Sequence, residues 1–190
     1  PSASSLVTDS AAAGSAWSCG QRVNNGSLNV APDGRRLTPL YEYGKQAGKW
    51  LGLVTTTRIT HATPASFAIA DPERNAEDRI AARLLDSGVD ILLGGGNRHF
   101  DPGAREDGED YFRKFEKAGY TVWKERSQVL SPAVASRDGA DCPRILGTFW
   151  DGHLPYSVDR DNDPAIAARV PTLLEMTEAA LARLRKSPNG

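Results

Sequence analysis

The sequence predicts an α/β fold in which a largely parallel central sheet carries helices on both faces, as an α/β/α sandwich. Segments with helically spaced apolar residues alternate three times with short apolar or β-branched segments. Helices that alternate with strands in this way favour a parallel sheet covered on both faces. The 190 residues are 39% hydrophobic and 25% charged, a composition typical of one globular domain, which we expect to span residues 1–190.

The first helix is expected over residues 10–19, where most side chains are small and suit close packing against a neighbour. The string Asn24-Asn25-Gly26 is a turn signal. The first helix and strand pair follows it. Residues 38–49 are expected to form the helix, with Thr38 as its N-cap. Residues 51–57, which include four β-branched side chains, are expected to form the strand.

Two further pairs consist of a helix, a glycine that ends it and a strand. In the first pair, a helix over residues 76–87 ends at Gly88 and is followed by a strand over residues 89–93. In the second pair, a helix over residues 110–117 ends at Gly119 and is followed by a strand over residues 120–123. A last helix over residues 172–186 ends in basic side chains, which suit the negative end of the helix dipole. The sequence contains no internal repeat.

The charge balance excludes some classes of function. The 23 basic and 24 acidic side chains give a net charge of −1, so no overall field draws the chain to nucleic acid or to an anionic membrane. No apolar run approaches the roughly 20 residues that cross a bilayer, and a signal peptide is either absent or already removed. Cys19 and Cys142 fit either two reduced thiols or one long-range disulfide.

Ser10 is the first candidate for chemistry. It follows Asp9 and begins a helix of small residues, so its simplest interpretation is the N-cap of that helix. The same position also suits a nucleophile, because a helix N-terminus favours an anion and small side chains let a phosphoryl group approach. No GxSxG motif surrounds Ser10, so an α/β-hydrolase is not indicated.

His61, Thr63 and Arg74 are the next candidates. His61 and Thr63 directly follow a predicted strand, where α/β folds place their sites. His61 is either a structural histidine or a ligand of a metal or of its bound water. Thr63 is either the N-cap of a helix with Pro64 at its first position or an oxygen ligand for a hard cation such as Mg²⁺. Arg74 is either solvated or a bidentate phosphate ligand, which Asp9 would help to orient.

Two other patterns are weaker. Gly94-Gly95-Gly96 lacks the spacing of nucleotide-binding loops, so a backbone turn near the sheet edge is the better interpretation. Cys142 and His153 are too far apart, with no other Cys or His nearby, to indicate a zinc site.

Taken together, these segments resemble the alkaline phosphatase family over nearly the whole chain. The string from Val7 to Ala12, continued by Ser15-Ala16-Trp17-Ser18 and Asn24-Asn25-Gly26, looks like that family's nucleophile segment. The string from Gly52 to Ala65 looks like its magnesium-binding segment. Arg74 stands eleven positions after Thr63, which matches the family's spacing between the magnesium-site hydroxyl and the phosphate-binding arginine.

The resemblance implies a phosphomonoester hydrolase that works at alkaline pH with two Zn²⁺ ions and one Mg²⁺ ion. Ser10, bound to zinc, would attack phosphorus and form a phosphoserine. Arg74 would bind two phosphoryl oxygens, and Asp9 would hold Arg74 in place. Thr63 would bind magnesium, and His61 stands where family members carry either an acidic residue or a histidine.

The resemblance also places the family's other metal ligands before Ser10 and after the last predicted helix. We therefore expect an incomplete domain, a chain that binds zinc poorly by itself and activity that depends on further residues. The remaining alternatives are a related phosphodiesterase or sulfatase and a non-catalytic phosphate-binding domain. By resemblance, the partners are phosphomonoesters and inorganic phosphate, the full enzyme is a homodimer, and it works in the periplasm or after secretion.

Overall fold

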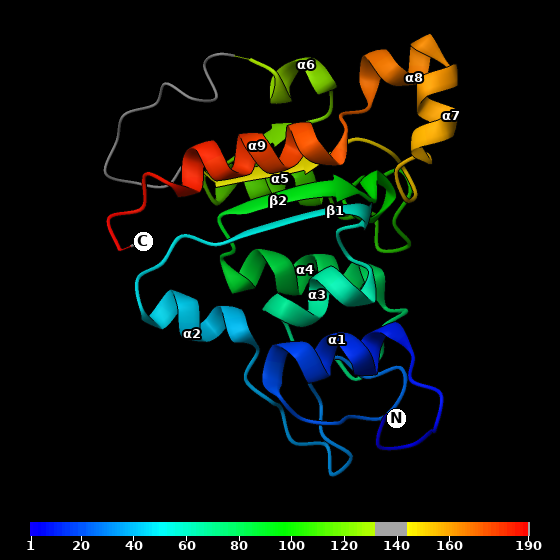
Figure 1. The fold of residues 1–190 in the computed structure, drawn as a ribbon, viewed down its shortest axis with the longest axis vertical. Coiled ribbons are helices and arrows are strands. Elements are labelled where there is room, and N and C mark those ends of the chain that lie inside the picture. Colours follow the sequence, from blue (N-terminus) through cyan, green and yellow to red (C-terminus); the bar gives the residue numbers. More distant parts are fainter. Residues whose placement is uncertain (132–143, 190) are drawn as a thin grey trace. The chain divides into compact units, whose positions relative to one another are not determined.

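The computed structural model describes residues 1–131 and 144–189 and divides into two compact units (Figure 1). The first unit contains Pro1–Gly48 and Thr60–Val89, and the second contains Lys49–Ile59 and Asp90–Gly190. That all 190 residues form a single domain stays a prediction.

The first unit is built from helices. They are α1 (Ser10–Cys19), α2 (Leu40–Gln46), α3 (Ala62–Ala68) and α4 (Glu77–Ser87). Helix α1 has the predicted bounds and packs closely on α3. At the crossing, a Cβ added to Gly14 would lie 2.4 Å from Ser66 Oγ. The small side chains of α1 therefore serve the close helix packing that the sequence predicts.

The predicted start of α2 is wrong. Pro39 is its N-cap, without a side-chain hydrogen bond, and the helix ends at Gln46 before Gly48, whose φ is +69°. Pro39 itself has extended backbone, with a ψ of +155°, so it takes the N-cap position and the helix begins one residue later than a Thr38 cap would give. Helix α4 agrees with the prediction, since Gly88 closes it with a φ of +64°.

The second unit contains a four-stranded sheet in which every neighbouring pair is parallel. The strands are β1 (Gly52–Arg58), β2 (Ile91–Gly95), β3 (Tyr120–Trp123) and β4 (Arg144–Thr148), in the order β1-β2-β4-β3. The predicted parallel sheet is therefore confirmed. Strand β4, which the sequence analysis missed, lies between β2 and β3.

Helices lie on both faces of this sheet, as predicted. Those of the second unit are η1 (Asn97–His99), α5 (Tyr111–Lys117), α6 (Arg126–Val129), α7 (Ser157–Asn162), α8 (Pro164–Arg169) and α9 (Leu173–Leu184). Side chains along a strand alternate between faces. Trp123 packs in the core that contains Met176 of α9. Tyr120, which points to the other face, makes an edge-to-face contact with the ring of Phe115 of α5, with centroids 4.8 Å apart.

The glycine-rich string after the second predicted strand is not a turn near the sheet edge, so that interpretation is wrong. Gly94 and Gly95 belong to the inner strand β2, and only Gly96 has a positive φ, of +101°. A Cβ on Gly94 would lie 2.9 Å from the carbonyl oxygen of Thr57, and one on Gly95 would lie 2.2 Å from that of Gly152. Close backbone packing explains these glycines.

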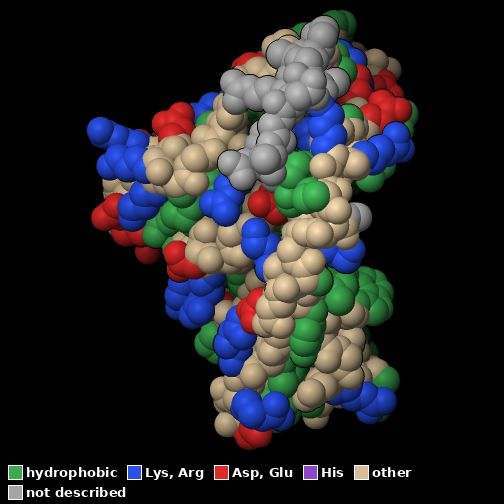
Figure 2. Space-filling model, turned by 90° about the vertical axis from the view of Figure 1, so that its left-hand side faces the viewer, with side chains coloured by type: hydrophobic (Ala, Val, Ile, Leu, Met, Phe, Trp, Pro, Cys, Tyr) green, Lys and Arg blue, Asp and Glu red, His purple; other side chains and the backbone are tan. Residues whose placement is uncertain are grey.

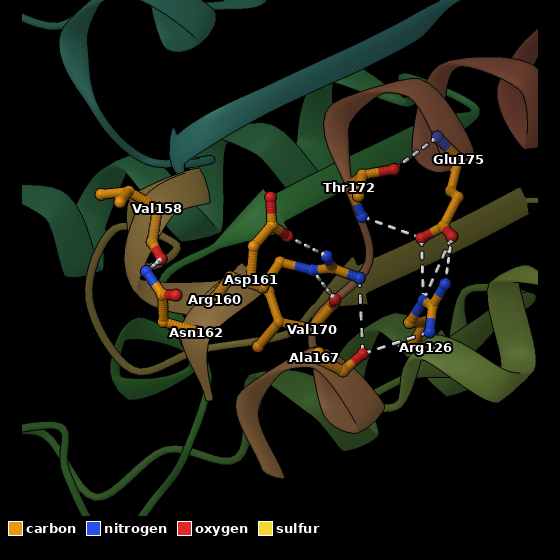
Figure 3. A network of polar contacts seen from close by, with 9 residues as sticks. All are labelled: Arg126, Val158, Arg160, Asp161, Asn162, Ala167, Val170, Thr172 and Glu175. Carbon is orange, nitrogen blue, oxygen red and sulfur yellow. Dashed lines mark hydrogen bonds and ion pairs between the residues drawn. The ribbon is translucent and has the colours of Figure 1, made fainter. Parts of the chain in front are cut away.

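An ion-pair network joins α6, α8 and α9 (Figure 3). Arg126 donates to both carboxylate oxygens of Glu175 and to the carbonyl of Ala167. Glu175 also accepts from the backbone N–H of Thr172, whose hydroxyl accepts in return from Glu175 N–H. This reciprocal capping box fixes the start of α9.

The surface matches the small net charge. On the face drawn in Figure 2, Lys and Arg side chains are interspersed with Asp and Glu. Over the described ranges, no helix has the length and hydropathy needed to span a membrane. Cys142 lies outside the described residues, so the alternatives for Cys19 stay open.

Candidate phosphate site

Asp9, not Ser10, is the N-cap of α1, so the capping interpretation of Ser10 is wrong. Asp9 has extended backbone, and its Oδ1 accepts from the backbone N–H of Ala12 at 2.8 Å. Ser10 is the first helical residue and is exposed. Within the described residues its hydroxyl makes no hydrogen bond to protein. The serine oxygen is therefore not used by the cap and faces solvent at the positive end of the helix dipole.

Asp9 also contacts Arg74, which lies 65 positions away in the loop before α4. Arg74 Nη1 donates to Asp9 Oδ2 at 3.0 Å, and the side chains of Arg74 and Asp9 are only 19% and 25% exposed. Burial raises the pKa of Asp9, but hydrogen bonds from Ala12, Arg74 and Gly26 together outweigh burial and leave this pKa below its usual value. The carboxylate is thus ionised and anchored at the start of α1.

His61 is the second partner of Arg74. Its Nε2 lies 3.1 Å from Arg74 Nη2. A guanidinium group only donates, so Nε2 must accept and a neutral His61 carries its proton on Nδ1. In this arrangement Arg74 occupies the Nε2 lone pair, which leaves that nitrogen unable to bind a metal at the same time.

Thr63 lies in the first turn of α3, and not at the N-cap position that the sequence predicts for it. His61 is the N-cap of α3, so Thr63 and Pro64 are its second and third residues and the predicted cap is wrong. Thr63 is half-buried. Its hydroxyl makes no hydrogen bond within the described part of the chain.

The geometry suits the binding of an oxyanion. Arg74 carries five N–H groups and uses two of them on Asp9 and His61. Within the described ranges the other three have no protein acceptor. Asp9 fixes both the start of α1, where Ser10 lies, and the guanidinium group that would bind the anion. The structure therefore brings both Asp9 and His61 into contact with Arg74, and Ser10 is next to Asp9 in the chain.

Residues 2–190 match the alkaline phosphatase family. The chain belongs to this family. It is 38% identical to alkaline phosphatase 3 of Bacillus subtilis over 97% of its length and 37% of the relative's length. The chain spans 35–46% of the length of the curated relatives that it matches.

Solved alkaline phosphatases have the same fold. The crystal structure of the Thermus thermophilus enzyme superposes with a TM-score of 0.88 at 45% identity, over 100% of this chain and 38% of that one. A histidine-to-aspartate mutant of the TAB5 alkaline phosphatase, with Mg bound in its M3 site, superposes with a TM-score of 0.76 at 27% identity, over 98% of this chain and 50% of that one.

The described residues offer only some of the ligands that the expected Zn²⁺ and Mg²⁺ ions would need. Within residues 1–131 and 144–189, no group of three His, Cys, Asp or Glu side chains is placed to hold a metal ion. Zinc sites take four ligands or three with a water, so the described residues do not fit a zinc site by themselves. The Thr63 hydroxyl fits one oxygen position around Mg²⁺, which prefers oxygen ligands.

Two residues that were not predicted as site residues also contact the candidate site. Asn25 and Gly26, predicted as a turn and as part of the string that resembles the nucleophile segment, contact the segment that precedes Ser10 and the carboxylate of Asp9. The Asn-Gly dipeptide was the available signal. Nothing in its local pattern indicates that the turn folds back on residues 16 and 17 positions earlier.

Proposed function

We propose that this chain forms the nucleophile-bearing and phosphate-binding part of an alkaline phosphatase that hydrolyses phosphomonoesters. The observation that carries the proposal is the double role of Asp9, which caps the helix that Ser10 begins and binds Arg74 at 3.0 Å. One carboxylate thereby fixes the serine and the guanidinium group relative to each other. Positioning of this kind is a large part of the catalysis of phosphoryl transfer.

In the proposed reaction, Arg74 binds two phosphoryl oxygens with N–H groups that the protein does not use. The N-terminus of α1 adds a favourable dipole. The oxygen of Ser10 bonds to phosphorus as the bond from phosphorus to the departing alkoxide breaks, and the Ser10 proton leaves to solvent. Water then cleaves the phosphoserine, which releases inorganic phosphate and restores the hydroxyl.

We also propose that Thr63 supplies one oxygen to Mg²⁺, and that the two Zn²⁺ ions implied by the resemblance take most of their ligands from outside the described residues. Ser10 and His61 stay predicted metal ligands. His61 can take this role only if Arg74 releases its Nε2, which lies 3.1 Å from the guanidinium. The magnesium part of the proposal is tested by measuring the bound metals of Thr63→Val and of the unchanged protein by mass spectrometry. We expect Thr63→Val to lose Mg²⁺ alone.

A second candidate is a chain that binds phosphate without turning it over. It is favoured by the contrast between a formed arginine site and the missing three-ligand metal cluster in the described residues. In that case the 190-residue chain binds inorganic phosphate through Arg74, and Ser10→Ala binds it equally well. Ser10 is then not a nucleophile, and supplying the rest of an alkaline phosphatase gives no turnover that depends on it.

The two candidates separate in a hybrid enzyme, in which this chain replaces the part of the Thermus thermophilus enzyme that it matches. We expect the hybrid to hydrolyse a chromogenic aryl phosphate at alkaline pH with added Zn²⁺ and Mg²⁺, and Ser10→Ala to abolish turnover. Ser157→Ala is the matched control, because Ser157 is also the exposed first residue of a helix. Turnover that survives Ser10→Ala would contradict the proposal.

Assembly and location follow from the family and are part of the same proposal. We propose a homodimer that works in the periplasm or after secretion. Light scattering of the hybrid enzyme tests the homodimer, and an active monomer would contradict it. Fractionation of the cells that make the natural protein tests the second, which fails if the activity stays in the cytoplasm.

A further inference from the structure

The segment that leads into α1 needs an anchor if Ser10 is to keep a fixed position. Residues 4–9 form no helix or strand, and the side chains of Leu6 and Val7 are 90% and 79% exposed. Apolar burial of these two side chains therefore contributes little to holding the segment. Its backbone must be held by hydrogen bonds instead.

Asn25 supplies three of these hydrogen bonds. Its Nδ2 donates to the carbonyl of Val7 at 2.9 Å, and its Oδ1 accepts from the backbone N–H of Asp9 at 3.2 Å. Its own backbone N–H donates to Ser4 Oγ at 2.9 Å. Because one end of the amide meets a carbonyl and the other an N–H, only one orientation of the side chain satisfies both. One exposed residue thus holds both ends of the segment.

Gly26 connects this segment to Arg74. Its backbone N–H donates to Asp9 Oδ2 at 3.0 Å, and its carbonyl accepts from the backbone N–H of Arg74 at 2.9 Å. The φ of Gly26 is +88°, a conformation that a side chain strongly disfavours. The backbone groups of one glycine therefore join the carboxylate and the arginine that it binds.

We propose that the turn formed by Asn25 and Gly26 is a positioning element of the phosphate site. Asn25 fixes the backbone that presents Ser10, and Gly26 fixes Arg74 relative to Asp9. Neither residue touches the phosphoryl group, so both act through their neighbours. This inference rests on the proposed function, since it assigns the turn to the reaction of Ser10.

The proposal predicts different defects for the two parts of the site. Loss of the Asn25 side chain frees the backbone before Ser10 but leaves Arg74 bound to Asp9 and Gly26. In the hybrid enzyme, Asn25→Ala should therefore lower kcat roughly tenfold or more, since small misplacements of reacting groups are costly. KM and inhibition by inorganic phosphate should change less than about twofold, because these depend on Arg74.

The control is Asn24→Ala, one residue earlier in the same turn. Asn24 takes part through its backbone carbonyl, which accepts from the N–H of Ser27, and this bond survives the substitution. We expect Asn24→Ala to keep kcat. Equal melting temperatures for both variants would separate positioning from a general loss of stability.

A second measurement does not depend on activity. In the 190-residue chain, Asn25→Ala should make the backbone amide of Asp9 exchange with solvent roughly tenfold faster, because it loses its acceptor. In Asn24→Ala, the backbone amide of Asp9 should exchange its hydrogen with solvent at the same rate as in the unchanged chain. Unchanged exchange at Asp9 in Asn25→Ala would overturn the anchoring role.

The outcomes distinguish this inference from the proposed function. If Ser10→Ala abolishes turnover of the hybrid but Asn25→Ala keeps kcat, the positioning role is overturned and the function stands. If Asn25→Ala lowers kcat and Asn24→Ala does so equally, the effect is not specific to the Asn25 side chain and the inference also fails. A fall in kcat for Asn25→Ala alone, with KM and melting temperature retained, supports it.

Discussion

Two arginine–carboxylate pairs, one in each compact unit, differ in how much of the arginine the fold uses. Both carboxylates also cap a helix, since Asp9 accepts from the first turn of α1 and Glu175 from the N-cap residue of α9. Arg126 makes several bonds to Glu175 and one to Ala167, from all three of its nitrogens (Figure 3). Arg74 gives one N–H to Asp9 and one to His61.

This difference separates a structural arginine from one that can bind a ligand. Every nitrogen of Arg126 is committed to protein acceptors that tie α6 to α8 and α9. Arg74 is held firmly by a capping carboxylate, yet its Nε, the counterpart of the nitrogen that Arg126 uses on Glu175, has no protein acceptor in the described ranges. A guanidinium group that is fixed but not saturated is suited to bidentate binding of phosphate.

The largest expected effect is on phosphate binding, and it tests the difference between Arg74 and Arg126 directly. Arg74→Ala should weaken binding of inorganic phosphate to the 190-residue chain by about 3 kcal/mol, roughly a hundredfold, because two charge-assisted hydrogen bonds are lost. Arg126→Ala should leave the phosphate Kd unchanged. Calorimetric titration measures both, and equal effects of the two substitutions would contradict the distinction.

The structural role of the Arg126–Glu175 pair is tested by the pH dependence of the free energy of unfolding. Hydrogen bonds from Arg126 lower the pKa of Glu175 to about 2, with burial acting in the opposite direction. A lowered pKa in the folded state stabilises the protein above the unfolded value of 4.5, and this stabilisation is lost as the pH falls from 4.5 toward 2.

At neutral pH this contribution is on the order of 2–3 kcal/mol. Glu175→Gln should therefore lower the free energy of unfolding at pH 7 by about that amount and flatten its decline below pH 4.5. Urea unfolding followed from pH 7 to pH 3 measures this. A variant that keeps the original decline would show that Glu175 is not its source.

The packing of α1 on α3 is a further feature of the unit that holds Arg74. Gly14→Ala should cost about 1–2 kcal/mol, because the new Cβ displaces Ser66 Oγ and breaks its hydrogen bond to the carbonyl of Thr63. Ser66→Gly removes the atoms in the way. In a double-mutant cycle by urea unfolding, Gly14→Ala should cost less in the Ser66→Gly background, and strict additivity would argue against the clash.

The smallest effect concerns the caps themselves. Thr172→Ala should reduce stability by about 1 kcal/mol through loss of the hydroxyl that accepts from Glu175 N–H, without any effect on phosphate binding. Asp9→Ala should reduce stability by a similar amount and also weaken phosphate binding, because Arg74 loses its partner. Thermal melting and phosphate titration of both variants measure the two quantities separately.

The parts of the fold that local chemistry determines could be predicted from the sequence. Small residues and a following glycine gave the bounds of α1, and Gly88 gave the end of α4. Strand β4 was missed because its short sequence, Arg-Ile-Leu-Gly-Thr, shows neither alternation nor a β-branched run. Its place between β2 and β3 depends on contacts from distant parts of the chain.

The candidate site divides in the same way. The sequence and the resemblance named Asp9, Ser10 and Arg74, but the adjacent Asp9 and Ser10 both suit an N-cap and local pattern cannot choose between them. The choice depends on Arg74 and Gly26, which use the second oxygen of Asp9. Thr63 was misplaced as a cap because proline is tolerated throughout the first turn, where N–H groups lack helical acceptors.

The most direct test of the central claim is to locate the phosphoryl group on the protein. The hybrid enzyme, incubated with an aryl phosphate and quenched in acid, is digested and its phosphorylated peptide is sequenced by mass spectrometry. We predict phosphate on Ser10, absent from Ser10→Ala and unaffected in Ser157→Ala. Phosphate on another residue, or continued turnover of Ser10→Ala, would contradict Ser10 as the nucleophile beside the Arg74 phosphate site.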